Sequence, residues 1–105
     1  LKSHVKDIFK AKKDLEIINA YGPTEATVSC TKKLIVKSDL EKNNISSLPL
    51  GKAISGMKIR LLNNGKYSKK SGEIVIFGKQ VASGYLNKKE NAKKFFFFKK
   101  RRAIF

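Results

Sequence analysis

Gly22 and Pro23 form the break that most constrains how this chain can fold, because neither residue can continue a regular strand or helix. Glycine allows unusual φ angles, whereas proline fixes its own φ and has no N–H to donate. An apolar run at residues 15–18 leads into the break, and a run rich in Thr and Val follows it at residues 26–31. We therefore predict a turn at the end of a strand.

The predicted turn presents three chemically different side chains together: the ring of Tyr21, the hydroxyl of Thr24 and the carboxylate of Glu25. Aromatic rings stack on other rings, and hydroxyls donate to phosphate oxygens. Mg²⁺ binds one or two carboxylates together with substrate phosphates. The three residues therefore suit a nucleotide that carries a metal ion.

The composition fits one small folded domain, with 105 residues of which 41% are hydrophobic. No apolar run is long enough for a transmembrane helix. The single cysteine, Cys30, excludes an internal disulfide and is compatible with a reducing cytoplasm; we interpret it as a buried small hydrophobe. His4 has no Cys or other His to form a metal site with, so zinc is not supported.

The formal net charge is +16, and 21 of the 24 basic residues are lysine. A charge of this size is typical of modules that bind nucleic acid or an anionic membrane surface. The lysines are, however, spread along the chain among many Asn, Ile and Phe residues, which use A/T-rich codons. We interpret the charge as genome bias and expect no specific nucleic-acid partner. A basic binding module stays open as an alternative, and it requires the lysines to gather on one folded face.

The first segment is predicted to be a helix followed by a strand. Residues 2–13 carry Val5, Ile8 and Phe9 at helical spacing, which indicates a short amphipathic helix. Residues 15–20 are mostly apolar and are expected to form a buried strand that leads into the turn.

After the turn, residues 26–36 are rich in Thr, Val and Ile, which favours a second strand. Ser38 is expected to cap a short helix, with Glu41 at the third position as in a capping box. The Asn pair at residues 43–44 is expected to end that helix.

The second half is predicted to be rich in strands. Residues 57–62 partly alternate in polarity and residues 73–77 form a mostly apolar run between Gly72 and Gly78, and each is expected to form a strand. Residues 63–66, Asn-Asn-Gly-Lys, are a strong turn signal, and residues 67–71 are expected to be a polar connection.

The end of the chain is predicted to be helical. Residues 81–86 are expected to form a bent segment, and Asn87 to cap a helix that runs through residues 90–92 and carries Phe95. The Lys- and Phe-rich tail at residues 93–105 has two interpretations. Aromatic and cationic residues together suit a membrane-surface anchor, but we favour a simple helix end altered by the same genome bias.

Several motifs stand in an order that matches a known family. Residues 19–25, Asn-Ala-Tyr-Gly-Pro-Thr-Glu, resemble the YGPTE signature of adenylate-forming (AMP-binding) enzymes. Residues 72–78, followed by residues 81–86 (Val-Ala-Ser-Gly-Tyr-Leu), are similar to the later GEI-x-I-x-G and V-x-x-GYL segments. Residues 48–52 resemble the P-[IV]-G-[KR] element between them. Within the superfamily the chain most resembles nonribosomal peptide synthetase adenylation domains and D-alanine–D-alanyl carrier protein ligases.

The resemblance implies a reaction and two partners. A carboxylate substrate attacks the α-phosphate of ATP with Mg²⁺ bound, which gives an acyl-adenylate and pyrophosphate. The acyl group then passes to the phosphopantetheine thiol of a carrier protein. The resemblance therefore implies an ATP-dependent amino-acid-activating ligase, with an acyl-CoA or fatty-acyl ligase as the alternative within the superfamily.

The resemblance also assigns roles to residues of the turn. Tyr21 would stack on adenine beside Asn19, with Ala20 and Gly22 also against the nucleotide. Thr24 would hydrogen-bond the α-phosphate, and Glu25 would bind Mg²⁺; these two would be the catalytic residues. The amino-acid pocket would be lined by Ala20, Val28 and Ser29, whose size suits a small or aliphatic substrate such as D-alanine.

The chain also departs from the family pattern. It carries no Ser/Thr/Gly-rich phosphate loop, and Ser83 stands where the family often has Arg. We expect the chain to be truncated before the TGD motif that supplies a ribose-binding aspartate, and to lack the C-terminal subdomain with its catalytic lysine. We therefore expect little or no adenylation by the isolated chain, because each absent contact removes roughly 2–4 kcal/mol of transition-state stabilisation.

The predicted architecture is an α/β (α+β) fragment of the large N-terminal domain of such an enzyme. Residues 1–47 would be the end of the nucleotide- and substrate-binding subdomain that carries YGPTE. Residues 48–105 would be a segment of a β-rich, barrel-like subdomain. The expected location is the cytoplasm.

Overall fold

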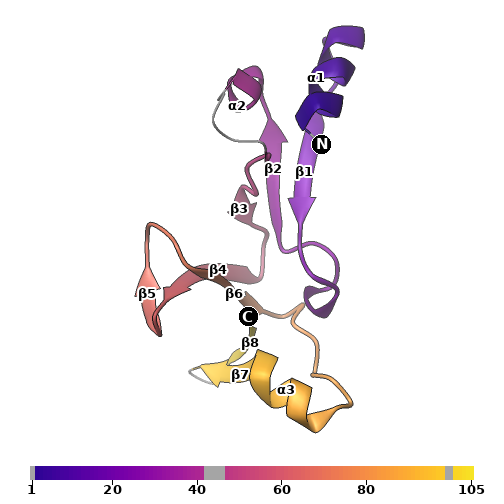
Figure 1. The fold of residues 1–105 in the computed structure, drawn as a ribbon. Coiled ribbons are helices and arrows are strands. Elements are labelled where there is room, and N and C mark those ends of the chain that lie inside the picture. Colours follow the sequence, from indigo (N-terminus) through magenta and orange to yellow (C-terminus); the bar gives the residue numbers. More distant parts are fainter. Residues whose placement is uncertain (1, 42–46, 99–100) are drawn as a thin grey trace.

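Two antiparallel sheets follow each other along the chain and lie at opposite ends of an elongated molecule (Figure 1). The computed structural model describes residues 2–41, 47–98 and 101–105, and its principal extents are 48 × 26 × 23 Å. The first sheet is formed within residues 17–53 and the second within residues 57–104. The mixed α/β character and the β-rich second half are thus confirmed.

The first sheet has the order β1-β2-β3, with bounds β1 (Ile17–Tyr21), β2 (Thr31–Ile35) and β3 (Lys52–Ala53). Two helices accompany it, α1 (Lys2–Ala11) and α2 (Lys37–Glu41). Their apolar residues form one core with the sheet, consisting of the buried residues Val5, Ile35, Leu40 and Leu48. The predicted helix and first strand are therefore both present, and Val5 lies on the buried face as expected.

Two details of β1 and β2 differ from the sequence predictions. β1 alternates between half-buried and exposed residues instead of being buried throughout, and Ile18 is 60% exposed where it pairs with Leu34. β2 begins only at Thr31, since Thr27 and Val28 have φ angles of 55° and 69°. These left-handed angles cannot occur within a strand, so the predicted strand over residues 26–36 was too long.

The predicted cap of α2 was also wrong. The helix begins at Lys37, so Ser38 lies inside it, and the carboxylate of Asp39 accepts a hydrogen bond from the Val36 N–H at 3.0 Å. Asp39 thus has the role of the reciprocal acid in a capping box, two residues before the predicted Glu41. The predicted end of this helix at residues 43–44 lies outside the described residues.

The second sheet has the order β5-β4-β6-β8-β7. Its strands are β4 (Met57–Asn63), β5 (Lys66–Ser68), β6 (Glu73–Gly78), β7 (Phe95–Phe98) and β8 (Arg101–Ile104). The described strands pair in an open order with β5 and β7 at its edges, so they form no closed barrel.

The turn at Asn64 and Gly65 is confirmed. Both residues have left-handed φ angles, 49° and 75°, and they join β4 to β5 as a two-residue hairpin loop. The prediction that residues 67–71 are only a polar connection was wrong, because the hairpin continues in β5 through Ser68.

The cap at Asn87 is confirmed, but the predicted helical tail was wrong. The Asn87 side chain accepts hydrogen bonds from two backbone N–H groups of α3 (Lys88–Lys94). The next residues form the β7–β8 hairpin, in which Phe96 stacks on Phe105 with ring centroids 4.7 Å apart. Phe95 and Phe96 pack against different core clusters, as successive residues of a strand do, and Phe97 is 71% exposed. Packing of these rings against the sheet stabilises the strand instead of an extended helix.

Candidate functional site

The turn after β1 is closed by a very near approach of two backbone segments. The Cys30 N–H donates to the Tyr21 carbonyl oxygen at 2.7 Å, and the Cys30 thiol donates to the same oxygen at 3.3 Å. A Cβ atom at Gly22 would lie only 2.8 Å from the Cys30 nitrogen and from the Val28 oxygen. Glycine is therefore required here because any side chain would meet the opposing backbone.

Cys30 is fully buried beside this turn, as the sequence predicted. Burial raises the pKa of the Cys30 thiol, which keeps it protonated and unreactive at neutral pH. Its function is therefore to fill the core behind the turn.

The turn itself is one short 3₁₀ helix, η1 (Thr24–Ala26), which begins directly after Pro23. The Ala26 N–H donates to the Pro23 carbonyl oxygen at 3.0 Å, and the Thr27 N–H to the Thr24 carbonyl oxygen at 3.1 Å. Thr24 is exposed and Glu25 is half-buried, so both residues of this turn have side chains accessible from the surface. Both residues thus lie on the one turn that the sequence predicted, and their role as a site stays a prediction.

Tyr21 and Asn19 occupy the half-buried face of β1. Tyr21 packs against the central core formed by Ala26, Cys30, Met57 and neighbouring residues, so part of its ring serves the fold. The Asn19 side chain donates to the Pro49 carbonyl oxygen at 2.9 Å, and this bond fixes its orientation.

The three residues predicted to line an amino-acid pocket lie on two different segments and differ in how far they are exposed. Ala20 is exposed on the opposite face of β1 from Tyr21. Val28 is 72% exposed and Ser29 is half-buried, both in the loop between η1 and β2. Their shared role as a pocket therefore remains a proposal.

The second motif folds back onto the first. The Ala82 N–H donates to the Glu25 carbonyl oxygen at 2.7 Å, and the Thr27 hydroxyl donates to the Gln80 carbonyl oxygen at 3.0 Å. The Tyr85 phenol donates to the carboxylate oxygen Oε1 of Glu25. Sequence reasoning placed Tyr85 in a motif but missed this contact, for which the only signal was the joint presence of the two motifs.

The hydrogen bond from Tyr85 changes the acidity of both partners. It is the largest cause of a lowered pKa for Glu25, to which the residue's own backbone and the charge of Lys94 add, while burial opposes it. The same bond is the largest cause of the raised pKa of the Tyr85 phenol. Glu25 is thus ionised and Tyr85 is protonated at neutral pH.

This pair predicts a specific dependence of stability on pH. A carboxyl with a lowered pKa contributes stability above its ordinary pKa of 4.5, and this contribution is lost as the pH falls through the lowered value. A phenol with a raised pKa contributes stability below its ordinary pKa of 10.0, and this contribution is lost as the pH rises through the raised pKa. The difference in unfolding free energy between wild type and Tyr85→Phe, measured in urea, should be constant between these limits and shrink outside them. A constant difference below pH 4 would contradict the prediction.

The residues present fit a magnesium ion only if a nucleotide completes its coordination. Among residues 2–41, 47–98 and 101–105, no group of three or more His, Cys, Asp or Glu side chains could hold a metal. Glu25 is a single ionised carboxylate, and Mg²⁺ bound by one carboxylate takes its other ligands from phosphates and water. The donor set therefore suits a metal that arrives with its nucleotide.

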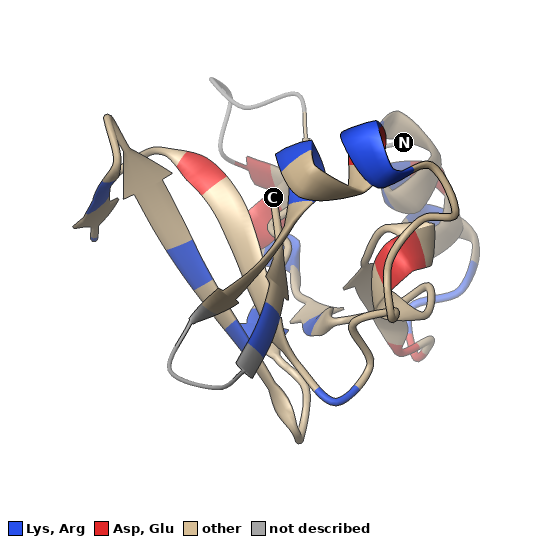
Figure 2. Cartoon of the chain, turned by 90° about the horizontal axis from the view of Figure 1, so that it is seen from below, with Lys and Arg blue, Asp and Glu red and all other residues tan. Residues whose placement is uncertain are grey.

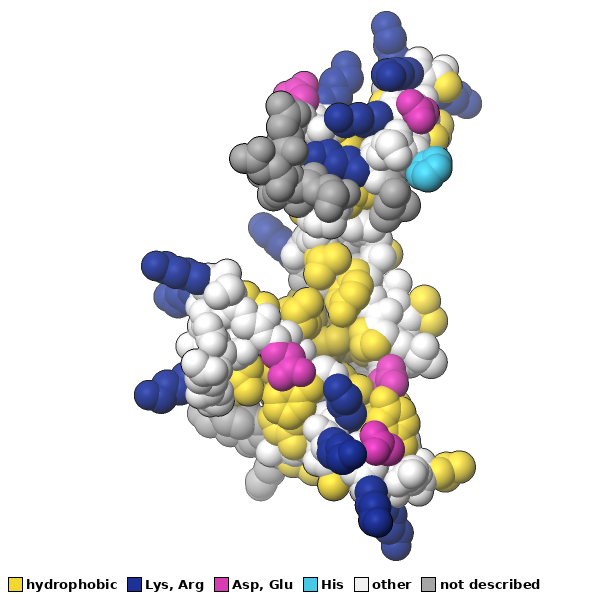
Figure 3. All heavy atoms as spheres, viewed as in Figure 1, with side chains coloured by type: hydrophobic (Ala, Val, Ile, Leu, Met, Phe, Trp, Pro, Cys, Tyr) yellow, Lys and Arg dark blue, Asp and Glu magenta, His cyan; other side chains and the backbone are white. Residues whose placement is uncertain are grey.

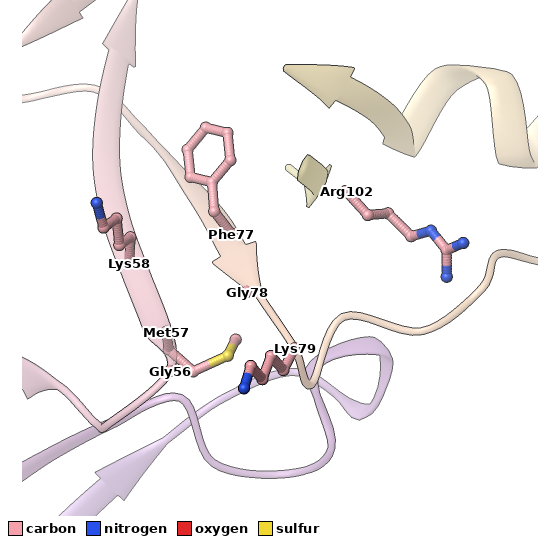
Figure 4. A pocket seen from close by; sticks show the side chains of 7 residues that line it. All are labelled: Gly56, Met57, Lys58, Phe77, Gly78, Lys79 and Arg102. Carbon is pink, nitrogen blue, oxygen red and sulfur yellow. The ribbon is translucent and has the colours of Figure 1, made fainter. Parts of the chain in front are cut away.

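A separate cavity of about 470 Å³ lies beside the second sheet, and its lining includes none of the turn residues. Phe77 and Met57 line it together with the cations Lys58, Lys79 and Arg102. Figure 4 shows the ends of the three cationic side chains pointing in different directions. They do not converge on one point, so the cavity is not arranged as a site for a single anion.

The basic residues are spread over the described surface. Figure 2 shows Lys and Arg on elements of both sheets and on the helices. On the face drawn in Figure 3, cations lie at both ends of the molecule, at the β5 edge and beside the middle, with hydrophobic, acidic and other surface among them. The face drawn in Figure 3 thus shows no single patch that gathers the cations. None of the described helices is long and apolar enough to cross a membrane.

The sequence profile of the AMP-binding enzymes matches residues 1–86. Because the match covers most of the chain, the protein belongs to the AMP-binding enzyme family. This agrees with the resemblance carried by the motifs.

The relatives that the chain matches include a carrier-protein ligase and a subunit of a peptide synthase. The chain is 42% identical over 84 residues to D-alanine–D-alanyl carrier protein ligase of Bacillus licheniformis, covering 77% of this chain and 16% of the ligase. It is 36% identical over 96 residues to surfactin synthase subunit 3 of Bacillus subtilis, covering 89% of this chain and 7% of that protein. The chain thus spans only a small part of the curated relatives it matches.

Solved structures of adenylation domains superpose on the fold of this chain. PA1221, a nonribosomal peptide synthetase protein with adenylation and PCP domains, superposes with a TM-score of 0.85 and 32% identity, covering 99% of this chain and 19% of PA1221. The Vibrio cholerae adenylation domain AlmE, solved with glycyl-adenosine-5'-phosphate, gives a TM-score of 0.74 and 27% identity, covering 99% of this chain and 20% of AlmE. The fold is therefore that of a segment of an adenylation domain.

Proposed function

We propose that this chain forms the part of an active site that contacts the α-phosphate and the metal ion. The enzyme would be an ATP-dependent one that activates an amino acid as its adenylate. The observation that supports this most directly is that η1 carries both an accessible Thr24 hydroxyl and the ionised Glu25 carboxylate, inside the family motif. A hydroxyl donor and an anion at one turn suit a phosphate that carries a metal.

The roles follow from the chemistry of each side chain. Tyr21 and Asn19 contact the adenine, with Ala20 and Gly22 beside the nucleotide. Thr24 donates to an α-phosphate oxygen. Glu25 holds Mg²⁺, which when bound supplies positive charge that stabilises the transition state of attack on the phosphate. The partly buried ring of Tyr21 and the fixed amide of Asn19 give these contacts a rigid base.

The proposed substrate is a small or aliphatic amino acid, with Ala20, Val28 and Ser29 against its side chain. The relatives support this choice, since one is a D-alanine ligase and another was solved with glycyl-adenosine-5'-phosphate. The proposed acceptor is a carrier protein, because the ligase acts with a carrier protein and PA1221 contains a PCP domain. We also propose a cytoplasmic location and the subdomain division of the parent enzyme at residues 47/48, with Leu48 and β3 of the second segment packing across it onto the first sheet.

A chimeric enzyme tests the proposal, because the resemblance places the phosphate loop and the catalytic lysine outside this segment. Residues 15–95 replace the matched segment of the Bacillus licheniformis ligase. We expect the chimera to catalyse D-alanine-dependent ATP–pyrophosphate exchange. The control is a chimera with the matched segment of the Streptococcus equi ligase, which is 35% identical to this chain. A chimera that is as stable as the control and shows no exchange with any small amino acid would contradict the proposal.

A further inference from the structure

Tyr85 is held in place by several independent contacts. Its ring meets Phe95 edge-on, with centroids 5.1 Å apart and an angle of 83°. Its backbone N–H donates to the Asn91 side-chain oxygen at 2.8 Å. Gly84 allows this, since a Cβ there would lie 2.2 Å from the same Asn91 oxygen. The phenol is therefore presented from a fixed ring on a fixed backbone.

The backbone and the side chain of Glu25 are both hydrogen-bonded to the segment at residues 82–85. Its backbone oxygen accepts from the Ala82 N–H, and its side-chain oxygen Oε1 accepts from Tyr85. Two residues further on, the Thr27 hydroxyl donates to the Gln80 carbonyl oxygen. A glutamate side chain has several rotatable bonds, and a fixed donor on one carboxylate oxygen restricts them. Oε2 then remains as the oxygen for a further ligand.

We propose that Tyr85 is a positioning residue for metal binding: it fixes the Glu25 carboxylate so that the second oxygen is oriented toward the metal of the bound nucleotide. The inference rests on the proposed function of Glu25. Fixing a ligand side chain before binding removes the ordering cost at the moment of binding. Loss of the phenol is expected to weaken metal–nucleotide binding about 3–10-fold, which is about 0.65–1.4 kcal/mol and lies within the cost of ordering one such side chain.

The test uses the 105-residue chain with Mn²⁺ and ATP as the probe. Binding is followed by the paramagnetic broadening of the backbone amides of residues 24–26 in NMR spectra. Tyr85→Phe keeps the ring on Phe95 and removes only the hydroxyl, and we expect about 3–10-fold weaker binding. Tyr67→Phe, on the far strand β5, is the matched control and should leave binding unchanged.

A double-mutant cycle separates positioning from general structural loss. If Tyr85 acts through Glu25, then Tyr85→Phe added to Glu25→Gln causes no further loss. An unchanged affinity in Tyr85→Phe, or the same loss with and without Glu25, would overturn the inference.

A second readout keeps the inference testable apart from the proposed function. Side-chain scalar couplings of Glu25 should report one rotamer in wild type and averaging in Tyr85→Phe, without any nucleotide. If the isolated wild type fails to bind Mn²⁺ and ATP, the exchange assay of the chimeric ligase decides the proposed function, and the couplings decide the positioning role. Equal averaging in the two proteins would reject it.

Discussion

Glu25→Gln, introduced into the chimeric ligase that carries residues 15–95, is expected to lower D-alanine-dependent ATP–pyrophosphate exchange by about 10²–10³-fold. The change keeps the shape of the side chain and removes the negative charge that would hold the metal. Loss of one preorganised electrostatic contact in an active site has effects of this size. The loss should fall mainly on kcat, since the developing charge on the phosphate is greatest in the transition state.

The matched control for this charge removal is Glu73→Gln. Glu73 is an exposed acid at the start of β6, in the second sheet. Its replacement should leave the exchange rate within twofold of the parent chimera, a tolerance of about 0.4 kcal/mol. If Glu25→Gln behaved like this control, Glu25 would not be a metal ligand of the reaction.

Gly22→Ala is expected to destabilise the chain by about 3 kcal/mol, the upper end of the range for overpacked sites. The added methyl group would lie 2.8–2.9 Å from three backbone atoms of residues 28–30. Backbone atoms cannot rotate away as a flexible side chain does, so the turn and the start of β2 must move. Urea unfolding followed by circular dichroism measures the loss.

Gly65→Ala is the matched comparison. Gly65 has a left-handed φ of 75°, but a Cβ there would meet no atom within 4 Å. Only the backbone conformation is then strained, which costs roughly 1–2 kcal/mol. The proposed crowding at Gly22 would be refuted by a loss no greater than that of Gly65→Ala.

The features that were predictable from the sequence are those with a local cause. The break at Gly22 and Pro23, the turn at Asn64 and Gly65 and the cap at Asn87 each depend on the backbone chemistry of one or two residues. The structure shows each of them at the predicted position.

The features that sequence reasoning missed depend on distant parts of the chain. β3 is only two residues long and exists because it pairs with β2, about 20 positions earlier. The β7–β8 hairpin exists because β8 pairs with β6 and the Phe rings pack on that sheet. A run such as Phe95–Phe98 after a helix carries no local signal of such a partner.

The candidate site divides in the same way. Thr24 and Glu25 were predictable because the turn and the motif are contiguous. Tyr85 was not assigned a role, because it lies 60 positions from Glu25 and only the fold brings them together.

The long sequence distance between Glu25 and Tyr85 has a consequence for the order in which the chain folds. Contacts that close large loops form late, since the entropy of loop closure must be overcome before they contribute. The links from η1 to the segment at residues 80–85 span 53 to 60 positions. A folding chain that has already paired β1 with β2 therefore still has an unrestrained Glu25. We expect the candidate site to become ordered only when the connection between β6 and α3 packs against η1.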